Sequence, residues 1–387
     1  MKQNWTYKKF SEVFNLQMGK TPSRDNLAYW GGNNVWVSIA DLKDKYIESS
    51  KEHITDIAVS ESGINKVPQG TAIMSFKLTI GRAAITKCDL FTNEAIMSFE
   101  PKEGKAISAD YIYYYLKGCK WTGANKAVKG QTLNKKTISE NVFSYPSLSE
   151  QSRIVSELDL LQSLIDKQKA QLKELDTLAQ SIFYDMFGDP VENEKGWEVK
   201  RLEEIVAEDC HISYGIVQPG DGVDNGIPVV RPIDMTHTFV YRTGLKQTTK
   251  EISDSYKRTI LKGNEILLCV RGTTGLVALA TEELVGCNVT RGIAPIECDA
   301  QNNRWFVYYQ FLTKGTQQYI ADYTKGIALK QINMKDVRDI PFVVPPLSLQ
   351  QEFAEKIEKV ERQKTAINQS IAETQKLFDY TMDKYFG

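Results

Sequence analysis

The sequence has few of the residues that build catalytic or metal centres. It contains only 3 histidines and 6 cysteines among 387 residues, and no cysteines form a C-x-x-C motif or have a histidine at ligand spacing. Reduced thiols are the expectation for such scattered cysteines, and no metal site is expected. The histidines lack a partner signature and are expected to be ordinary surface or hydrogen-bonded residues.

Motifs of several enzyme classes are also missing. The sequence has no Asn-Pro-Pro-aromatic tetrad or Phe-x-Gly-x-Gly loop of the adenine methyltransferases, no Walker A loop and no Gly-x-Ser-x-Gly elbow. Asp189 followed by Glu198 and Lys200 weakly resembles a nuclease metal triad, although the start of an internal repeat explains Trp197–Lys200 better. An enzyme with chemistry of its own is therefore the least favoured class.

Long hydrophobic runs and a strong charge of one sign are absent as well. The best apolar run, Ile266–Val270, ends at Arg271 and is far too short to span a membrane. The first residues, MKQNWTYKK, have no apolar stretch after the lysines, so no secretory signal is expected. We expect a cytoplasmic protein with no membrane partner. The net charge of −1 by itself gives no indication of a nucleic-acid partner.

Two long segments, Glu150–Phe187 and Gln350–Phe386, contain neither Gly nor Pro. Their apolar residues recur in alternating steps of three and four, which is typical of a coiled-coil seam. The second seam is weaker, because it includes Lys364, Thr374 and Thr381. A long helix with one narrow seam needs a partner helix, and each segment offers the other one. The expected helix-pair interface consists of Ile154, Leu158, Leu161, Ile165, Leu172, Leu175 and Ile182 in the first segment and Phe353, Ile357, Val360, Ile367, Ile371 and Phe378 in the second.

The two segments also begin and end alike. Each follows a Pro-Leu-Ser signal and finishes in Phe-Gly, so Ser149 and Ser348 are expected N-caps and Gly188 and Gly387 are expected stops. Two unrelated amphipathic helices, each packed on its own domain, remain the alternative, but the matched ends favour a helix pair. The segments together carry a net charge of −4 and the rest of the chain +3, which weakly favours a polyanion partner.

The chain repeats itself with a period of about 195 residues, the size of a domain plus a long helix. Trp5–Lys8 resembles Trp197–Lys200, and Tyr111–Leu116 resembles Phe306–Phe311. Each globular half has the mixed pattern of an α+β domain. We expect a first domain at residues 1–145, a helical segment at 146–188, a second domain at 189–341 and a C-terminal helical segment at 342–387.

Short β-branched runs and helical patterns alternate within each half. The expected strands are Asn34–Ile39, Thr71–Phe76, Ala83–Thr86, Pro228–Arg231, Glu265–Val270 and Leu276–Ala280. The expected helices are Lys8–Phe14, Ala109–Leu116, Leu202–Ala207 and Arg304–Thr313. The tyrosines of the second and fourth helices are expected in the core.

Three loops in each half carry Arg, Lys, Gln or Thr beside Gly. Such residues suit DNA, because Gly lets the backbone come close, Arg pairs with guanine, Gln with adenine, and Thr reaches a phosphate. One such loop would be read as a solvated turn, whereas their recurrence in the same order favours a shared binding face. The candidate contacts are Lys20, Thr21, Ser23, Arg24, Lys77, Thr79, Arg82, Lys126, Lys129 and Gln131 in the first half and Tyr214, Gln218, Arg231, Arg271, Thr273, Thr274, Arg291, Lys325, Lys330 and Gln331 in the second.

This ordered combination resembles the specificity (S) subunit, HsdS, of type I restriction–modification enzymes, over essentially the whole chain. The resemblance rests on two variable halves alternating with two similar helical segments and on the GKTPSR and RGTTG loops at Gly19–Arg24 and Arg271–Gly275. It also rests on the Pro-Leu-Ser-x-Gln-type entries at Pro146–Gln151 and Pro345–Gln351. Lys77 departs from the family, which often has Arg at this place.

The resemblance implies two α+β target recognition domains separated by two long antiparallel coiled-coil helices, with a pseudo-twofold internal repeat. It implies a non-catalytic subunit in which each domain reads one half of a bipartite double-stranded DNA site. The helices would set the gap and dock two methyltransferase subunits. The assembled complex would be an adenine-specific DNA methyltransferase and, with restriction subunits, an ATP-dependent endonuclease of phage defence. This chain would bind no cofactor, since S-adenosylmethionine, ATP and Mg belong to the partner subunits.

Two other classes of protein remain open. A stand-alone regulator with a bipartite DNA site would bind tightly and specifically without a methyltransferase, in a salt-sensitive manner. A coiled-coil protein-interaction adaptor would not bind DNA at any salt concentration.

Overall fold

The computed structural model describes residues 2–102, 107–123, 125–127, 130–327 and 329–387, with the backbone alone for residues 125–127 and 130–131. The chain divides into two compact units, Met1–Lys169 with Gln369–Gly387 and Ala170–Asn368. Both long helices pass from one unit into the other, so each unit is a globular domain joined to half of each helix.

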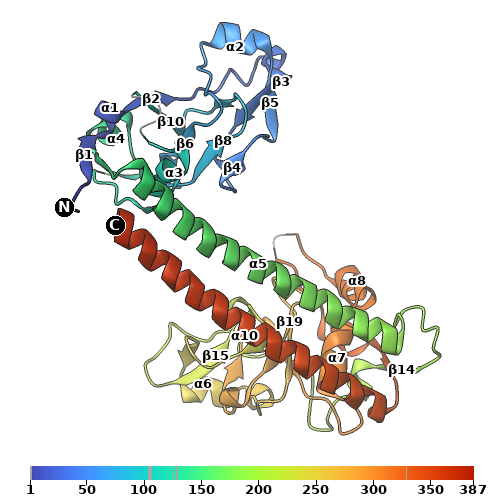
Figure 1. Ribbon diagram of the computed structural model, residues 1–387. Helices are drawn as coiled ribbons and strands as arrows, with labels where there is room; N and C mark the ends of the chain where they lie inside the picture. The colour runs from blue at the N-terminus through green and yellow to red at the C-terminus, as the bar shows by residue number, and fades with distance from the viewer. Residues whose placement is uncertain (1, 103–106, 124, 128–129, 328) are drawn as a thin grey trace. The chain divides into compact units, whose positions relative to one another are not determined.

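The first unit is built on a five-stranded sheet in the order β2-β10-β6-β8-β4 (Figure 1). The central strands β6 and β8 are buried along their whole length, as expected for continuous apolar runs. Smaller sheets, β5-β3-β9, β11-β12-β7 and β1-β13, complete the unit. The strands are β1 (Thr6–Lys9), β2 (Phe14–Met18), β3 (Trp30–Val37), β4 (Tyr46–Ile47), β5 (Glu52–Ile54), β6 (Ala72–Ser75), β7 (Lys77–Leu78), β8 (Ala83–Thr86), β9 (Phe91–Thr92), β10 (Ile96–Pro101), β11 (Asn125–Ala127), β12 (Gly130–Thr132) and β13 (Val142–Tyr145). The helices are α1 (Phe10–Val13), α2 (Asp56–Ser62), α3 (Ala109–Gly118) and α4 (Lys135–Glu140).

The second unit repeats this plan with the sheets β16-β19-β18-β21, β17-β15-β20 and β14-β22. In both units the first strand pairs antiparallel with the strand just before a long helix, β1 with β13 and β14 with β22. The strands of the second unit are β14 (Glu198–Arg201), β15 (Ile227–Val230), β16 (Phe239–Val240), β17 (Lys246–Thr248), β18 (Ile266–Cys269), β19 (Val277–Ala280), β20 (Asn288–Val289), β21 (Ile293–Ile296) and β22 (Pro341–Val344). Its helices are α6 (Lys250–Asp254), α7 (Arg304–Phe311), α8 (Lys314–Tyr323) and α9 (Met334–Arg338).

The helices α5 (Leu148–Phe187) and α10 (Leu347–Phe386) each have 40 residues, about 60 Å at 1.5 Å per residue. In the first unit they pack antiparallel, since Arg153 contacts Tyr385 at 3.0 Å while Gln168, further along α5, donates to Ser370, earlier on α10, at 2.6 Å. The two helices lie side by side there (Figure 1).

The second unit holds the other halves of the two helices in the same antiparallel arrangement. Lys364 lies 2.8 Å from Asp176, and further along α5 the ring of Phe187 packs against Phe353. The helix pair is therefore present within both units, which excludes two helices packed on separate domains. In the described residues, no helix is both long enough and apolar enough to cross a bilayer.

Most residues of the predicted seams lie in the two main cores. Ile154, Leu158, Ile165, Leu175, Phe353, Ile357, Val360 and Phe378 are buried, whereas Leu161, Leu172, Ile182, Ile367 and Ile371 are half-buried. At the end of α5 the buried residues are Phe183 and Phe187 rather than Ile182, so the seam shifts by one residue there. Four-residue steps replace the mixed spacing because this end packs on α7 as well as on α10.

Three local predictions were wrong. The long helices begin at Leu148 and Leu347, so Ser149 and Ser348 lie inside the first turn and are not N-caps; Ser147 instead accepts from the N–H of Glu150 at 3.4 Å. The expected helix Leu202–Ala207 is a single 3-10 turn at Leu202–Glu204. The helix expected at Lys8–Phe14 is the four-residue α1, because Thr6–Lys9 forms strand β1 instead.

A buried glutamine explains the Pro-Leu-Ser-x-Gln-type entry. The side chain of Gln151 donates to the carbonyl of Pro146 at 3.0 Å and accepts from the N–H of Ser108, the N-cap of α3, at 3.0 Å. Gln350 does the same with Pro345 at 2.8 Å and with Asn303, the N-cap of α7, at 2.8 Å. Each long helix is thus tied to the core helix of its domain by one side chain.

Candidate nucleic-acid interface

In the second unit, the loops predicted to contact DNA lie next to one another. The segment around Ile216 runs beside Val289–Arg291, because the N–H of Ile216 donates to the carbonyl of Val289 at 2.8 Å. The N–H of Arg291 then donates to the carbonyl of Ile216, also at 2.8 Å. Arg231 follows a strand that is joined to the same segment, since the N–H of Thr290 donates to the carbonyl of Val230 at 2.9 Å.

The same segment is joined to the loop at residues 271–274 and to the segments at residues 325–327 and 329–331. The N–H of Val270 donates to the carbonyl of Gly292 at 2.8 Å, and the N–H of Ile332 donates to the carbonyl of Val270 at 3.1 Å. The N–H of Gly272 donates to the carbonyl of Lys330 at 2.9 Å. Loops that are more than 100 residues apart in the sequence therefore form one continuous edge of the unit.

The first unit has the same three backbone links at the equivalent places. The N–H of Lys20 donates to the carbonyl of Thr92 at 2.8 Å, and the N–H of Phe76 donates to the carbonyl of Ala95 at 2.9 Å. The N–H of Leu133 donates to the carbonyl of Phe76 at 2.9 Å. The segments at residues 20–24, 77–82, 125–127 and 130–132 are therefore brought together by a repeated backbone framework.

A glycine allows the closest approach in each framework. A Cβ on Gly19 would stand 2.0 Å from the carbonyl oxygen of Thr92, and a Cβ on Gly215 would stand 2.0 Å from that of Val289. Any side chain here would push the loop away from the neighbouring strand. The GKTPSR loop therefore needs its Gly for packing.

The edge of the second unit is positively charged. Arg271 is half-buried, whereas Arg291, Lys325 and Lys330 are exposed. In the described part of the chain, no carboxylate lies within ion-pair distance of any of these four cations. Tyr214, Gln218, Thr273 and Gln331 are exposed beside them and supply hydroxyl and amide groups, while Thr274 is half-buried. Uncompensated cations with hydrogen-bonding neighbours are what binding to a nucleic-acid backbone and bases requires.

Two predicted arginines are held by carboxylates. Arg24 forms a bidentate ion pair with Glu52, in which Nη2 lies 3.0 Å from Oε2. Its guanidinium also lies 3.9 Å from the ring centre of Trp30. The hydrogen bond from Arg24 holds the pKa of Glu52 below its usual value. Arg231 contacts Asp234 in the same manner at 2.7 Å. These contacts fix the direction of each guanidinium and neutralise part of its charge.

One more candidate of the first unit, Thr21, contacts a second carboxylate. Thr21 donates to Glu94, and this hydrogen bond holds the pKa of Glu94 below its usual value. Lys77 is half-buried, and the side chains of Lys20, Ser23, Thr79 and Arg82 are exposed. The sequence analysis missed Glu52 and Glu94, because both residues lie outside the candidate loops along the chain and reach Arg24 and Thr21 only in the folded domain.

Three further candidates cannot be placed. Lys129 lies outside the described residues, and the side chains of Lys126 and Gln131 lie outside them as well. The backbone of Lys126 belongs to strand β11 and that of Gln131 to β12; the two strands pair with each other, and β12 also pairs with β7 at Lys77. Among the described residues, no group of three or more His, Cys, Asp or Glu side chains is arranged to hold a metal ion.

The duplicated plan of two α+β domains and two shared helices matches known proteins. The chain matches the protein-family model described as Type I restriction modification DNA specificity domain twice, over residues 2–177 and 194–376. The chain belongs to this family. Both matches begin near the first strand of a unit and extend into a long helix, as the repeat in the sequence does.

Individual members of the family are similar over most of their length. The MjaIX specificity subunit of Methanocaldococcus jannaschii is 26% identical over 91% of this chain and 85% of its own. The EcoBI specificity subunit of Escherichia coli is 24% identical over 69% of this chain and 62% of its own.

Solved structures share the fold. The crystal structure of the type I restriction-modification S subunit from M. genitalium aligns with a TM-score of 0.54 and 13% identity, over 99% of this chain and 96% of that one. A chain from a structural study of type I R-M assembly and conformational transition aligns with a TM-score of 0.58 and 17% identity, over 100% of this chain and 98% of that one.

Proposed function

We propose that this specificity-family chain is the non-catalytic DNA-recognition subunit of a type I restriction–modification complex. Each unit reads one half of a bipartite double-stranded DNA site. Methylation and cleavage are performed by partner subunits, which hold S-adenosylmethionine, ATP and Mg. The named relatives, which are specificity subunits, support this assignment.

The observation that carries the proposal is the repeated loop framework. The same three backbone links bring basic and amide-bearing loops to one edge of each unit, although the residues on the two edges differ. Lys77 stands where Arg271 stands, because Phe76 and Val270, which precede them, occupy equivalent places in the framework. One framework with two sets of side chains suits a protein that reads two different sequences.

The long helices are proposed to set the gap between the half-sites and to dock two methyltransferase subunits. Two features support the first role: each helix is uninterrupted over 40 residues, and each is tied to a domain through Gln151 or Gln350. A rigid connection allows the two DNA-recognition domains only certain separations along a duplex, just as a dimeric DNA-binding protein requires a set spacing between its half-sites.

The decisive experiment is co-expression with a cognate methyltransferase subunit, followed by genome-wide mapping of methylated adenines. The expected result is a split, asymmetric motif that appears only when this chain is present. The double variant Lys77→Ala, Thr79→Ala should alter one half of the motif, and Arg271→Ala, Thr273→Ala should alter the other half.

The outcome also separates the rival classes. Methylation that is independent of this chain, together with tight specific DNA binding by the chain alone, would identify a stand-alone regulator. No DNA binding at low salt, with or without the methyltransferase, would identify an adaptor.

A further inference from the structure

The second unit has a local insertion that the first unit lacks. In the first unit, strand β2 runs regularly along β10, from Phe14 opposite Pro101 to the hydrogen bond from Gly19 to Ile96. In the second unit the matching contacts are Val206 with Cys298 and Gly215 with Ile293. The partner strand has the same length in both, but the chain opposite it is four residues longer in the second unit.

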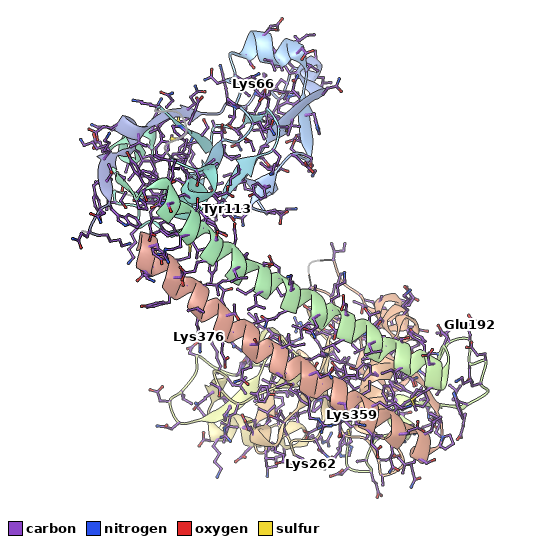
Figure 2. All side chains as sticks on the ribbon, viewed as in Figure 1. Lys66, Tyr113, Glu192, Lys262, Lys359 and Lys376 are labelled. Atoms are coloured by element: carbon purple, nitrogen blue, oxygen red, sulfur yellow. The ribbon has the colours of Figure 1, made fainter. Side chains whose placement is uncertain are left out.

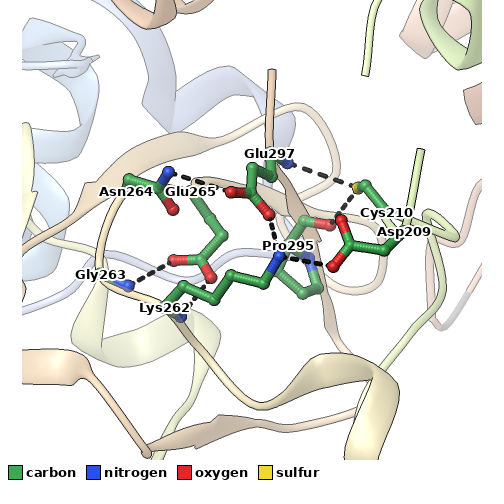
Figure 3. Close-up of polar contacts among 8 residues, drawn as sticks. All are labelled: Asp209, Cys210, Lys262, Gly263, Asn264, Glu265, Pro295 and Glu297. Atoms are coloured by element: carbon green, nitrogen blue, oxygen red, sulfur yellow. Dashed lines mark hydrogen bonds and ion pairs between the residues drawn. The ribbon is translucent and has the colours of Figure 1, made fainter. Parts of the chain in front are cut away.

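The start of this insertion is held firmly by polar contacts (Figure 3). Asp209 lies 2.8 Å from the ammonium of Lys262, which also lies 2.6 Å from Glu297. The sulfur of Cys210 accepts from the N–H of Glu297 at 3.4 Å and lies 3.9 Å from the carbonyl of Pro295. The extra residues are therefore an ordered part of the domain that packs against its strands. In Figure 2 Lys262 is labelled among the side chains of this unit.

The middle of the insertion contains a strained residue. Ile212 is 2% exposed and has a φ of 38°, a value that β-branched residues rarely adopt. Its carbonyl accepts from Nη2 of Arg338 at 3.1 Å, and the carbonyl of His211 accepts from the same nitrogen at 3.4 Å. Strain of this kind persists only where surrounding contacts enforce it, and it is common at ligand sites.

The insertion forms one wall of a cavity of about 450 Å³. The lining residues are Glu203, Cys210, His211, Ile212, Ser213, Arg258 and Arg338. Within the described residues neither arginine has a carboxylate at ion-pair distance. Glu203, the carboxylate of the lining, lies 2.6 Å from Arg201, which also contacts Glu204 and Asp339. Arg258 and Arg338 therefore have no counter-charge in the described part of the chain, and Ser213 adds a hydroxyl group beside the loop at residues 214–218. This combination favours an anion in the cavity.

Arg258 is presented from a fixed position. It lies in the 3-10 turn Lys257–Thr259, and the buried hydroxyl of Thr259 donates to Asn288 at 2.7 Å. Asn288 is fully buried in β20, next to the segment that holds the loop at residues 214–218. The turn therefore keeps Arg258 in place while its side chain stays exposed at the cavity.

We propose that this cavity binds a phosphate of the DNA backbone beside the half-site that the second unit reads. Arg258 and Arg338 supply the charge, and Ser213 supplies a hydroxyl donor. The inference rests on the proposed function, because Ser213 of the cavity lining directly precedes Tyr214, the first residue of the loop that is predicted to read bases. The regular strand β2 has no such insertion, so the contact belongs to the second half-site only.

The test compares Arg258→Gln with Lys257→Gln in the complex with methyltransferase subunits. Both variants lose one positive charge in the same turn, but only Arg258 lines the cavity. Each phosphate contact contributes about 0.9 to the slope of log affinity against log salt. Arg258→Gln should flatten that slope by about 0.9, so that the affinity loss between about 50 mM and about 200 mM salt becomes about 3.5-fold smaller. The methylated motif should not change, and Lys257→Gln should behave as the wild type.

A methylphosphonate scan locates the contact. One neutral linkage in the second half-site should weaken wild-type binding, and the same linkage should have no further effect on Arg258→Gln. Arg258→Lys should recover most of the slope, because a phosphate contact needs charge more than a guanidinium. Equal slopes for Arg258→Gln and Lys257→Gln would overturn the proposal, as would a change of the methylated motif in Arg258→Gln.

Two further measurements are needed. The first distinguishes a DNA phosphate from free inorganic phosphate, and the second distinguishes failure of this inference from failure of the proposed function. If inorganic phosphate at constant ionic strength raises the Tm of the wild type but not of Arg258→Gln, while their DNA slopes agree, the cavity binds free phosphate and the DNA assignment is wrong. If the wild-type complex methylates no split motif, the proposed function is wrong. The slopes measured on a random duplex then still decide whether Arg258 contacts the backbone.

Discussion

The ammonium nitrogen of Lys364 on α10 lies 2.8 Å from a carboxylate oxygen of Asp176 on α5. Lys364 also lies 2.7 Å from Glu361, which accepts a hydrogen bond from Tyr309 of α7 at 2.9 Å. Burial lowers the pKa of Lys364, but its contacts with Glu361 and Asp176 outweigh burial, so this pKa lies above its usual value. The charged residue in the apolar seam therefore connects α5, α10 and α7 within the second unit.

Replacing Lys364 by Met should strongly destabilise the second unit. The carboxylate of Glu361 is 5% exposed and would lose its cation, which costs about 3–5 kcal/mol for a buried pair. Urea unfolding followed by tryptophan fluorescence measures the change in free energy. Lys359→Met, on the exposed face of α10, is the matched control and should change it by less than about 0.5 kcal/mol. Equal effects of the two substitutions would contradict a role for the buried pair.

The glutamine that ties α10 to α7 should matter far more than its neighbour. Gln350→Ala leaves the N–H of Asn303 and the carbonyl of Pro345 without their buried partner, at about 1–3 kcal/mol for each group. Gln351 is exposed, so Gln351→Ala should be nearly neutral. Thermal unfolding of the two variants gives the comparison, and a similar Tm for both would refute the predicted tie.

The glycine at the closest approach of the loop framework in the second unit, Gly215, should tolerate no side chain. In Gly215→Ala the new Cβ meets a carbonyl oxygen at 2.0 Å, so the loop must move, at about 3 kcal/mol. Gly272→Ala has open space around it and bears only the backbone strain of a φ of 89°, about 1–2 kcal/mol. We expect Gly215→Ala to abolish recognition of the second half-site while the first half-site is still read. Methylation mapping would show an unchanged motif if this expectation is wrong.

Arg271 should read a base of the second half-site. If its guanidinium pairs with guanine, Arg271→Ala weakens specific binding by about 1–3 kcal/mol and relaxes the motif at one position. Arg271→Lys keeps the charge but loses the paired hydrogen bonds, so it should relax the motif while the salt dependence stays the same. Unchanged affinity and motif in Arg271→Ala would exclude this residue from recognition.

The stability of the first unit should fall in acid through a lysine that joins its domain to α5. Lys45 lies 2.8 Å from Asp110 and 2.7 Å from Asp159. Burial raises the pKa of Asp110, but hydrogen bonds from Lys45 and Tyr46 outweigh it and leave the pKa below its usual value. The stabilisation is therefore complete above the unfolded pKa of about 3.9 and is lost as pH falls through the lower folded value.

Removing Lys45 changes this dependence in a measurable way. In Lys45→Met burial is no longer offset by the lysine and the pKa of Asp110 shifts upward, so the variant is less stable than the wild type near neutral pH but loses less stability between neutral pH and acid. Urea unfolding over about pH 3 to about pH 6 tests this shift. Lys43→Met, an exposed neighbour, should follow the wild-type profile. Coinciding profiles of Lys45→Met and Lys43→Met would disprove the assigned pairing.

Local patterns predicted much of the fold and less of the site. The strands β6, β8, β18 and β19 were located from short apolar runs, because a buried strand needs only local sequence to be recognised. The N-cap of α5 was predicted at Ser149, whereas Ser147, two residues earlier, accepts from the N–H of Glu150, because only the fold decides which of the two serine hydroxyls meets the first turn. Glu52 and Glu94 were missed because their partners, Arg24 and Thr21, are brought to them only by folding.

The amino-acid sequence by itself determined the duplication, the two long helices and the family resemblance, because apolar spacing and turn signals act between residues that are close along the chain. Only the tertiary structure decided which loop residues remain free for a ligand. Arg24 and Arg271 look alike as basic loop residues, yet Arg24 is held by Glu52 whereas Arg271 has no carboxylate partner among the described residues. The strained cavity at Ile212 likewise depends on Arg338, which is more than 100 residues away along the chain. Charge and strain of this kind arise from long-range contacts, which a local pattern does not encode.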